Sequence, residues 1–323
     1  MKNSILKKIT AITIAAVLTF SLSACSNSSN SIKFGSAAVG GMYSAFASAY
    51  TQIISDNDSN LNISVRSTAG SAANIRLLSE EYIQLAIAQA DLVDAAYNGT
   101  GDFSDNPLKG YSAIASLYSE ACQIVVKADS DIISPDDLLG KTVSVGEEES
   151  GSERNALQIL QAYGLSKDLL TCKNLDYSEA AEALLNGEID AMFITAGTQT
   201  SVIEELAKQE NIRLLSLDSG HIAKLKASYS FLSEYTIPAN TYTGVDTDIK
   251  TVGVESLLLA SDSLDAAVVE QLTTLLFDHS SEIQYSLPLD FDLDIVSATE
   301  NVTIPFHQGA YNYYKSNGVS VEE

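Results

Sequence analysis

The stretch Ile32–Ile54, IKFGSAAVGGMYSAFASAYTQII, indicates the fold class of the chain. It begins with a short apolar strand and continues through a loop of small residues, Ser36–Gly41. From Met42 onward, apolar residues recur at helical spacing, so we expect one face of a helix to be buried. A strand, a glycine-containing loop and a helix in this order are typical of α/β proteins.

The same loop predicts a place for an anionic group. Gly40 and Gly41 let the backbone turn sharply and bring its N–H groups close to a ligand. The first N–H groups of the following helix have no partner within it, and the helix dipole favours negative charge at that end. We therefore expect a small ligand with a carboxylate to bind there. A tight turn without a ligand is the alternative.

This unit of strand, small-residue loop and helix recurs along the chain. LNISV (61–65) precedes the loop Ser67–Ser71, and KTVSV (141–145) precedes Gly146–Glu153. The apolar strand IDAMFIT (189–195) precedes a fourth loop of small residues. Ligands of open α/β sheets bind outside the carboxyl ends of the strands. We therefore expect the four loops, two in each half of the molecule, to face one another across a cleft.

Candidate ligand-binding residues are the glycines and the polar side chains in or beside these loops. Hydroxyl groups can bind a ligand, but they can also cap a helix, and we expect about half of the polar candidates only to cap. The candidates are Gly40, Gly41, Tyr43, Thr68, Ser71, Asn74, Gln89, Ser150, Gly151, Ser152, Glu153, Thr195, Gly197 and Thr200.

Charged side chains near the loops give further expectations. Asp91 and Glu153 could receive the ammonium group of an amino acid ligand, although Asp91 could equally cap the helix that follows it. Arg66 and Arg154 could pair with a carboxylate through two parallel hydrogen bonds. For Arg154 we favour a pair with a nearby glutamate instead.

The N-terminal residues resemble the leader of a bacterial lipoprotein. Three lysines precede the apolar segment Ile9–Leu22, which is too short to span a membrane as a helix. The segment ends in LSAC, and the resemblance implies cleavage of a signal peptide, 1–24, and lipid on Cys25. Residues 25–31 are then a flexible, lipidated tether. We expect an extracytoplasmic protein that acyl chains hold at the cell membrane.

Charge and cysteine content exclude some partners. The net charge is −24, and removal of the three leader lysines makes it −27. Such a surface repels nucleic acid and anionic lipid, so any bound anion must be held by local dipoles. After Cys25 only Cys122 and Cys172 remain. A disulfide between them is possible in an oxidising compartment, but we favour two structural thiols.

Seven motifs in order resemble those of the TAXI family, the extracytoplasmic solute receptors of tripartite ATP-independent periplasmic (TRAP) transporters. The resemblance extends over about residues 32–317, nearly the whole chain after the leader. The motifs are FGSAAVGGMYSAFA (34–47), STAGSAANIRLL (67–78), AIAQAD (86–91), SLYSEACQIVVKADS (116–130), LLGKTVSVGEEESGSERNA (138–156), LLNGEIDAMFITAG (184–197) and IPFHQGAYNYYKSNG (304–318).

This resemblance implies an α/β protein with the type II periplasmic-binding-protein fold. Two α/β domains are joined by crossing hinge strands, and the ligand lies in the cleft between them. We expect crossings in Thr251–Ala260 and near Ser119–Ala121, the latter separating the strands Tyr111–Tyr118 and Cys122–Val126. The expected domains are 32–120 with 252–323 (domain 1) and 121–251 (domain 2).

The resemblance also implies a function. Characterised members bind glutamate-like amino acids or dicarboxylates and deliver them to a membrane permease, so we expect a small carboxylate ligand and a TRAP permease as partners. No cofactor, metal or catalytic residue is expected. The alternative is a ligand-sensing subunit that uses the same two-domain clamp to report to a membrane signalling partner.

Some residues depart from the family's pattern. The first loop has Ser36, Ala37, Ala38 and Val39 where the family has more glycines. Tyr-Ser-Glu-Ala (118–121) stands where Tyr-Pro-Glu-Pro is common. The loop of the second domain carries three consecutive acids, Glu147–Glu149, which disfavour a dicarboxylate unless they point outward.

Enzyme functions are disfavoured by the sequence. His221, His279 and His307 are far apart and lack the spacing of zinc ligands. No Gly-x-Ser-x-Gly stretch is present. The first loop does not match a dinucleotide-binding fingerprint, because the second strand ends in Arg66 rather than an acid. Calcium binding by Glu147–Glu149 is an alternative to a solvated loop, which we favour.

Overall fold

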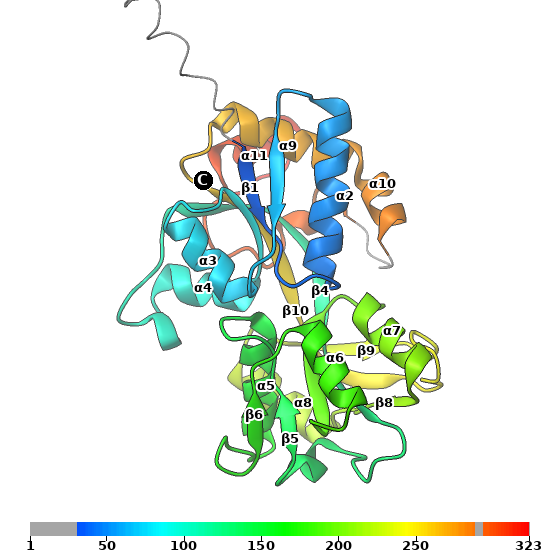
Figure 1. Cartoon of the computed structure of the whole chain (residues 1–323). Helices are drawn as coiled ribbons and strands as arrows, with labels where there is room; N and C mark the ends of the chain where they lie inside the picture. Colours follow the sequence, from blue (N-terminus) through cyan, green and yellow to red (C-terminus); the bar gives the residue numbers. More distant parts are fainter. Residues whose placement is uncertain (1–30, 288–292, 323) are drawn as a thin grey trace, which may run out of the picture.

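The computed structural model describes residues 31–287 and 293–322. Figure 1 shows two lobes, through both of which run two long strands, β4 (Tyr111–Lys127) and β10 (Ile249–Ser261). The expected leader and its Cys25 lie outside the described residues.

The first lobe forms around the opening stretch of the sequence. β1 (Ile32–Gly35) leads through the small-residue loop into α2 (Met42–Asn57), and Phe46, Tyr50 and Ile54 lie on the buried face of α2. The remaining elements of this lobe are β2 (Ile63–Arg66), α3 (Ser71–Ser79), β3 (Leu85–Gln89), α4 (Ala90–Asn98), α9 (Ala266–Asp278), α10 (Ser280–Ser286) and α11 (Gln308–Ser316), with short 3-10 turns at Gly101–Phe103 and Ser297–Thr299.

The second lobe repeats the strand, loop and helix pattern. α5 (Gly151–Ala162) follows β5 (Thr142–Ser144), and α7 (Ser201–Gln209) follows β7 (Ala191–Ala196), as the loop positions predict. The other elements are a 3-10 turn (Pro135–Leu138), β6 (Thr171–Lys173), α6 (Tyr177–Leu185), β8 (Ile212–Leu214), α8 (Ser219–Ser228) and β9 (Ser233–Ile237).

All ten strands belong to one mixed sheet with the order β2-β1-β3-β10-β4-β7-β5-β6, in which β8 also pairs with β4 and β9 with β10. β1, β2 and β3 are mutually parallel, and so are β5, β6 and β7. β10 is antiparallel both to β3 and to β4. The carboxyl ends of each parallel set therefore point toward the junction of the lobes (Figure 1).

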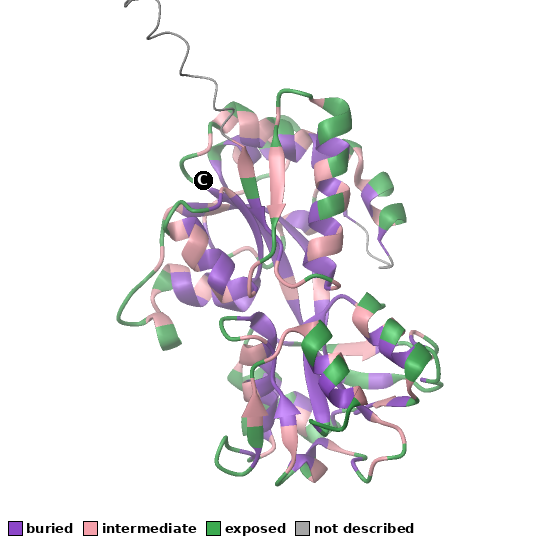
Figure 2. Cartoon of the chain, in the orientation of Figure 1, coloured by how far each residue is buried: buried purple, intermediate pink, exposed green. Residues whose placement is uncertain are grey.

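The apolar core changes from one lobe to the other within the two long strands. In β4, residues up to Tyr118 pack in the core of the first lobe, and residues from Ala121 pack in the second. In β10 the same change falls between Val254 and Leu257. Figure 2 shows both strands largely buried within the lobes, with partly exposed stretches where they pass between them. Glu120 lies where the two cores separate.

β4 is one continuous strand, which corrects the expectation of two strands separated by Ser119–Ala121. Ser119 and Glu120 pair with Glu255 and Val254 of β10, and Ala121 pairs with Gly253. Polar residues interrupted the apolar pattern and suggested a connection. Antiparallel pairing satisfies their backbone groups in a strand instead.

Both cysteines of the described region are free thiols, as predicted. Cys122 is buried and Cys172 is partly exposed. Within residues 31–287 and 293–322, no helix is long and apolar enough to cross a membrane. The same residues contain no group of three or more His, Cys, Asp or Glu side chains placed to hold a metal ion.

The close contact between α11 and α9 predicts that a methyl group added at Gly309 destabilises the folded protein. A Cβ at Gly309 would overlap the backbone of Ala266 and Glu270. We expect Gly309→Ala to lower the free energy of unfolding by about 1–3 kcal/mol, measured by urea denaturation. Gln308→Ala, at the exposed neighbouring position, is the control. Equal stability of the two variants would contradict this packing.

Candidate functional site

A cavity lies between the lobes, where loops and helix N-termini from both meet. It offers about 30 Å³ to a water-sized sphere, which is room for one or two water molecules. Its walls come from the starts of α2, α3, α5 and α6 and from the strands β3, β4 and β7. Eight of the predicted residues line it: Gly41, Tyr43, Ser71, Gln89, Ser150, Gly151, Ser152 and Thr195.

Six predicted residues do not line this cavity: Gly40, Thr68, Asn74, Glu153, Gly197 and Thr200. Asn74 is buried and donates through Nδ2 to the carbonyl of Ile87 at 2.8 Å, while Thr68 Oγ1 donates to Asn74 Oδ1 at 2.7 Å. This pair ties the second loop to the sheet. We predicted both side chains as ligand contacts, but in the structure they hold the loop in place.

The other four residues also have partners within the protein. Thr200 Oγ1 donates to the Gly197 carbonyl at 2.7 Å and closes the turn before α7. Glu153 accepts from Asn174 Nδ2 at 3.0 Å, on the outer side of its loop. The Gly40 carbonyl accepts from Ser201 Oγ of the other lobe at 2.9 Å. Gly40 therefore contributes to the contact between the lobes, whereas Gly41 lines the cavity.

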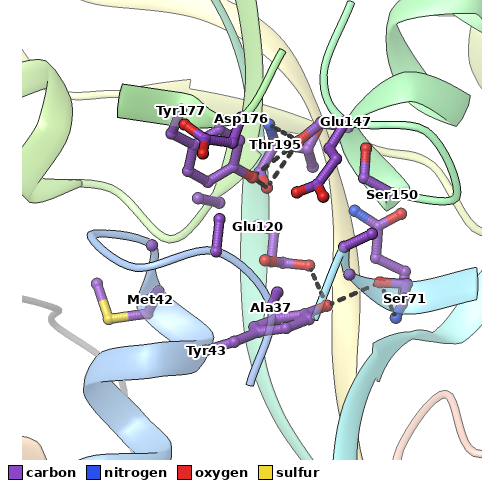
Figure 3. Close-up of a pocket in the computed structure, with 18 residues that line it drawn as sticks. Ala37, Met42, Tyr43, Ser71, Glu120, Glu147, Ser150, Asp176, Tyr177 and Thr195 are labelled. Carbon is purple, nitrogen blue, oxygen red and sulfur yellow. Dashed lines mark hydrogen bonds between the residues drawn. The ribbon is translucent and has the colours of Figure 1, made fainter. Parts of the chain in front are cut away.

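Glu120 is the main residue of the cavity that was absent from the predicted set. Its side chain is 2% exposed and lies between the two lobes. Tyr43 Oη donates to Glu120 Oε2 at 2.8 Å, and Ser71 Oγ lies 3.3 Å from Tyr43 Oη. Figure 3 shows Glu120 between Tyr43 and Ser71 on one side and Tyr177 and Thr195 on the other.

The environment of Glu120 disfavours its charge. Burial raises the pKa of Glu120 to about 8, and the negative charges of Asp91 and Glu255 act in the same direction. Hydrogen bonds from Tyr43 and Gln89 oppose this rise without cancelling it. The carboxyl group of Glu120 therefore gains or loses its proton close to neutral pH.

The opposite wall of the cavity is built by α6 and β7. Tyr177 Oη donates to the Thr195 carbonyl at 3.0 Å and lies 2.8 Å from Ser152 Oγ, which in turn accepts from the Thr195 N–H at 2.9 Å. The hydroxyl groups of Tyr177 and Ser152 are thus hydrogen-bonded to each other and to the backbone of Thr195. Tyr177 was not predicted, because its place just after the helix cap Asp176 gives no sign of the cavity.

The cavity is acidic. Glu120, Glu147 and Asp176 line it, and no Lys, Arg or His is among the described lining residues. Burial raises the pKa of Glu147, with the charges of Asp176 and Glu179 adding to the effect. The sequence predicted three consecutive acids near a cleft. Glu147 borders the cavity, Glu148 is exposed, and Glu149 pairs with Arg76.

Glu149 connects its loop to α3 of the other lobe. Its carbonyl accepts from the N–H groups of Ala72 and Ala73 at 3.1 and 3.2 Å, so it caps the N-terminus of α3. Its carboxylate accepts two hydrogen bonds from Arg76, at 3.0 and 2.8 Å. The residue has φ of +65°, an uncommon conformation for a non-glycine residue. These contacts across the cleft occupy the first amides of α3.

A second ion pair crosses the cleft. Arg154 Nε lies 2.8 Å from Asp91 Oδ2, and its Nη1 lies 3.6 Å from Asp102 Oδ2. This corrects the expectation that Arg154 pairs with a nearby glutamate. Asp91 is buried, and burial raises its pKa although the charge of Arg154 acts against the rise. The carboxylate of Asp91 is therefore already paired, and Asp91 lies in the first turn of α4, whose N-cap position is occupied by Gln89.

One sequence signal could have identified Glu120. It is the only acidic residue in the 17-residue strand Tyr111–Lys127. An unpaired acid in a buried strand is costly unless it has a specific role. For Arg154 and Glu149 no comparable local signal exists, because their partners lie in the other half of the molecule.

Comparison with known proteins bears on the family and the fold. The chain matches the model of the NMT1-like family over residues 34–318. A periplasmic transporter structure is 15% identical, with a TM-score of 0.51 over 80% of this chain and 86% of that chain. A protein from Bordetella bronchiseptica RB50 is 16% identical, with a TM-score of 0.51 over 80% and 76% of the two chains.

The periplasmic aliphatic sulphonate binding protein SsuA from Escherichia coli is 15% identical, with a TM-score of 0.45 over 80% of this chain and 75% of that chain. At such identities a likeness shows the fold alone. The two structures with a TM-score of 0.51 confirm the predicted α/β periplasmic-binding-protein fold with two domains.

The ion pair between Arg154 and Asp91 predicts a change in how the lobes hold together. Arg154→Ala leaves a buried carboxylate without its charged partner, which costs about 1.5–3 kcal/mol. We expect the amides of Ala72 and Ala73, which donate across the cleft, to exchange with deuterium at least about tenfold faster. Lys208→Ala, which removes an ion pair within α7, is the control. Unchanged exchange in Arg154→Ala would show that this pair does not hold the lobes together.

The raised pKa of Glu120 predicts a dependence of stability on pH. The folded protein keeps this proton up to about pH 8, whereas the unfolded chain loses it near pH 4.5. Stability that Glu120 contributes at low pH is therefore lost as pH rises through this window. Relative to Glu120→Gln, the wild type should lose about 1 kcal/mol per pH unit between pH 5 and 8, measured by urea denaturation.

The control for this experiment is Glu188→Gln, at an exposed position. It should follow the wild type at every pH. Parallel stability curves for wild type and Glu120→Gln would mean that Glu120 titrates normally in the folded protein.

Proposed function

We propose that this chain, which belongs to the NMT1-like family, is an extracytoplasmic solute receptor that binds a small molecule between its two lobes. The observation that carries the proposal is the cavity at their junction, which residues of both lobes line. A ligand that contacts both walls stabilises the closed arrangement, because binding shifts the population toward the state in which all its contacts form.

In this proposal the two lobes are the two domains of a hinged receptor. Domain 1 is 32–120 with 252–323, and domain 2 is 121–251. Support comes from the change of core within β4 and β10, which leaves each lobe with its own apolar interior. The hinge would lie where the two strands pass between the cores, and the ion pairs across the cleft would form on closure.

We further propose that the ligand carries a carboxylate, as in a glutamate-like amino acid or a dicarboxylate. The start of α2 supports this: Gly41, Met42 and Tyr43 line the cavity, and no side chain caps the N-terminus of the helix. The N–H of Gly41 donates to the Ala38 carbonyl at 3.3 Å, so a carboxylate would accept from the amides of Met42 and Tyr43, without a buried counter-charge. Ligand contacts would come from Gly41, Tyr43, Ser71, Gln89, Ser150, Gly151, Ser152 and Thr195.

The proposed partner is the membrane permease of a TRAP transporter, with lipid on Cys25 keeping the receptor at the membrane. Deletion of the gene should then abolish uptake of the ligand by the cell. A ligand-sensing subunit is the second candidate, and in that case uptake would persist while a signalling response is lost. A binding protein rather than an enzyme is proposed, because the cavity offers hydrogen-bonding groups on walls from both lobes.

A thermal-shift screen of the chain without its leader tests the receptor proposal. The panel contains amino acids, dicarboxylates and sulfonates, with sugars and metal ions for comparison. A true ligand at 100 times its Kd should stabilise the protein by about 2.7 kcal/mol. In Gly151→Val the new side chain would meet Gln89 across the cleft, so we expect Kd to rise at least about tenfold.

Gly220→Val is the matched control, since Gly220 also lies in the first turn of a helix but away from the cavity. It should bind as the wild type does. The receptor proposal is wrong if no organic acid or amino acid stabilises the protein, or if Gly151→Val responds like the wild type.

A further inference from the structure

We propose that Glu120 sets the charge of the ligand: its carboxylate receives an ammonium group, so the cleft binds an α-amino acid and rejects the corresponding acid without the amino group. This inference rests on the receptor function proposed above and narrows its ligand class. It assigns a specificity-determining role to a residue that lies in the strand passing between the lobes.

The position of Glu120 supports this role. The carboxylate is 2% exposed, lines the cavity and lies at the boundary between the two cores. The hydroxyl of Tyr43 donates to Oε2 at 2.8 Å from the side of the first lobe. A buried carboxylate is normally paired with a cation, yet the described structure gives Glu120 no cationic partner among the ion pairs.

The charges around the cavity disfavour a dicarboxylate. Glu120, Glu147 and Asp176 line it, without a Lys, Arg or His among the described lining residues. The two arginines at the edge of the cleft are already committed, Arg76 to Glu149 and Arg154 to Asp91. A ligand with two negative charges would face three acidic side chains and no free cation among the described lining residues. An ammonium group offsets part of that charge.

Gln89, which also hydrogen-bonds to Glu120, points to a ligand with hydrogen-bond donors. Its side chain is 1% exposed and lines the cavity, and its Oε1 atom has no hydrogen-bond partner in the described structure. A buried acceptor without a partner costs free energy. An ammonium group has three N–H donors, enough to reach Glu120 and Gln89 together. A carboxylate has none.

The protonation of Glu120 predicts whether the affinity rises or falls with pH. Burial raises its pKa to about 8, so the free receptor holds a proton there at pH 7. Binding of an ammonium group favours the ionised carboxylate and releases that proton. Affinity should therefore rise by up to about tenfold per pH unit between pH 6 and 8. A ligand carboxylate that accepts from protonated Glu120 would instead bind more weakly as the pH rises.

Other titratable groups surround Glu120 and have to be considered in this profile. Burial raises the pKa of the nearby tyrosines and of the Cys122 thiol, so these groups stay neutral between pH 6 and 8. Asp91 is paired with Arg154, and burial raises the pKa of Glu255. The groups are Tyr43 on α2, Asp91 on α4, Tyr118 and Cys122 on β4, Glu147 before α5, Asp176 and Tyr177 at the start of α6, and Glu255 on β10. Burial also raises the pKa of Glu147, so Glu147→Gln is titrated beside Glu120→Gln and should keep the proton release.

The test is isothermal titration calorimetry of the chain without its leader. Each standard L-amino acid is titrated beside the acid that lacks its α-amino group, such as L-glutamate beside glutarate. Titrations at pH 6, 7 and 8, in buffers of different ionisation enthalpy, count the protons released. We expect one amino acid to bind at least about 100-fold more tightly than its counterpart and to release close to one proton at pH 7.

Two variants assign the effect to Glu120. Glu120→Gln keeps the shape but removes the charge, so it should weaken the amino acid at least about tenfold and abolish proton release. Glu188→Gln, at an exposed position outside the cavity, also removes one carboxylate but leaves Glu120 in place, so preference for the amino acid should persist. The inference is overturned if the acid without an amino group binds as well, if protons are taken up, or if Glu120→Gln retains affinity and proton release.

This result is separate from that of the receptor proposal. If the screen finds a ligand that Gly151→Val weakens but no amino acid is preferred, the receptor function stands and the role of Glu120 is wrong. If nothing in the screen binds, both are wrong.

Discussion

The antiparallel pairing of β4 with β10 is the constraint on which the rest of the structure depends. Both strands run through both lobes, and their backbone hydrogen bonds continue across the junction at Glu120 and Val254. Each half of the strand pair completes a parallel set, β1 to β3 in one lobe and β5 to β7 in the other. The loops at the carboxyl ends of these sets therefore meet at one place. Glu120, in the strand pair at that place, therefore lies between two apolar cores and is part of neither.

The helix N-termini at this place are not equivalent, although the sequence makes them look alike. The first amides of α3 are occupied by the carbonyl of Glu149 from the other lobe. Ser150 caps α5 through its own side chain. The start of α2 has no side-chain cap and borders the cavity. Of these three potential anion sites, the start of α3 is occupied by a contact between the lobes and the start of α5 by a local cap. Only the start of α2 faces the cavity without a side-chain partner among the described residues.

The charged side chains differ between the edge of the cleft and the cavity inside it. Around the cleft, Arg76 and Arg154 each pair with an acid of the opposite lobe. Inside, the described lining residues supply carboxylates and hydroxyl groups but no cation. Sequence reasoning placed Glu147, Ser150 and Arg154 near a cleft, which is where they lie. It could not tell which acid faces inward, because three adjacent glutamates have the same side chain and differ only in the direction the loop gives each of them.

The sequence by itself determined the strand, loop and helix units, because their hydrophobic periodicity and their glycines act over a few residues. It also determined which loops gather, since strand ends in a parallel sheet share an edge. Only the tertiary structure decided the partners of Glu120, Arg154 and Asn74. Tyr43 and Glu120 are 77 positions apart, and Asp91 and Arg154 are 63 apart. Such pairs depend on how two lobes meet, and burial there changes the pKa of a carboxyl group in a way that no local pattern records.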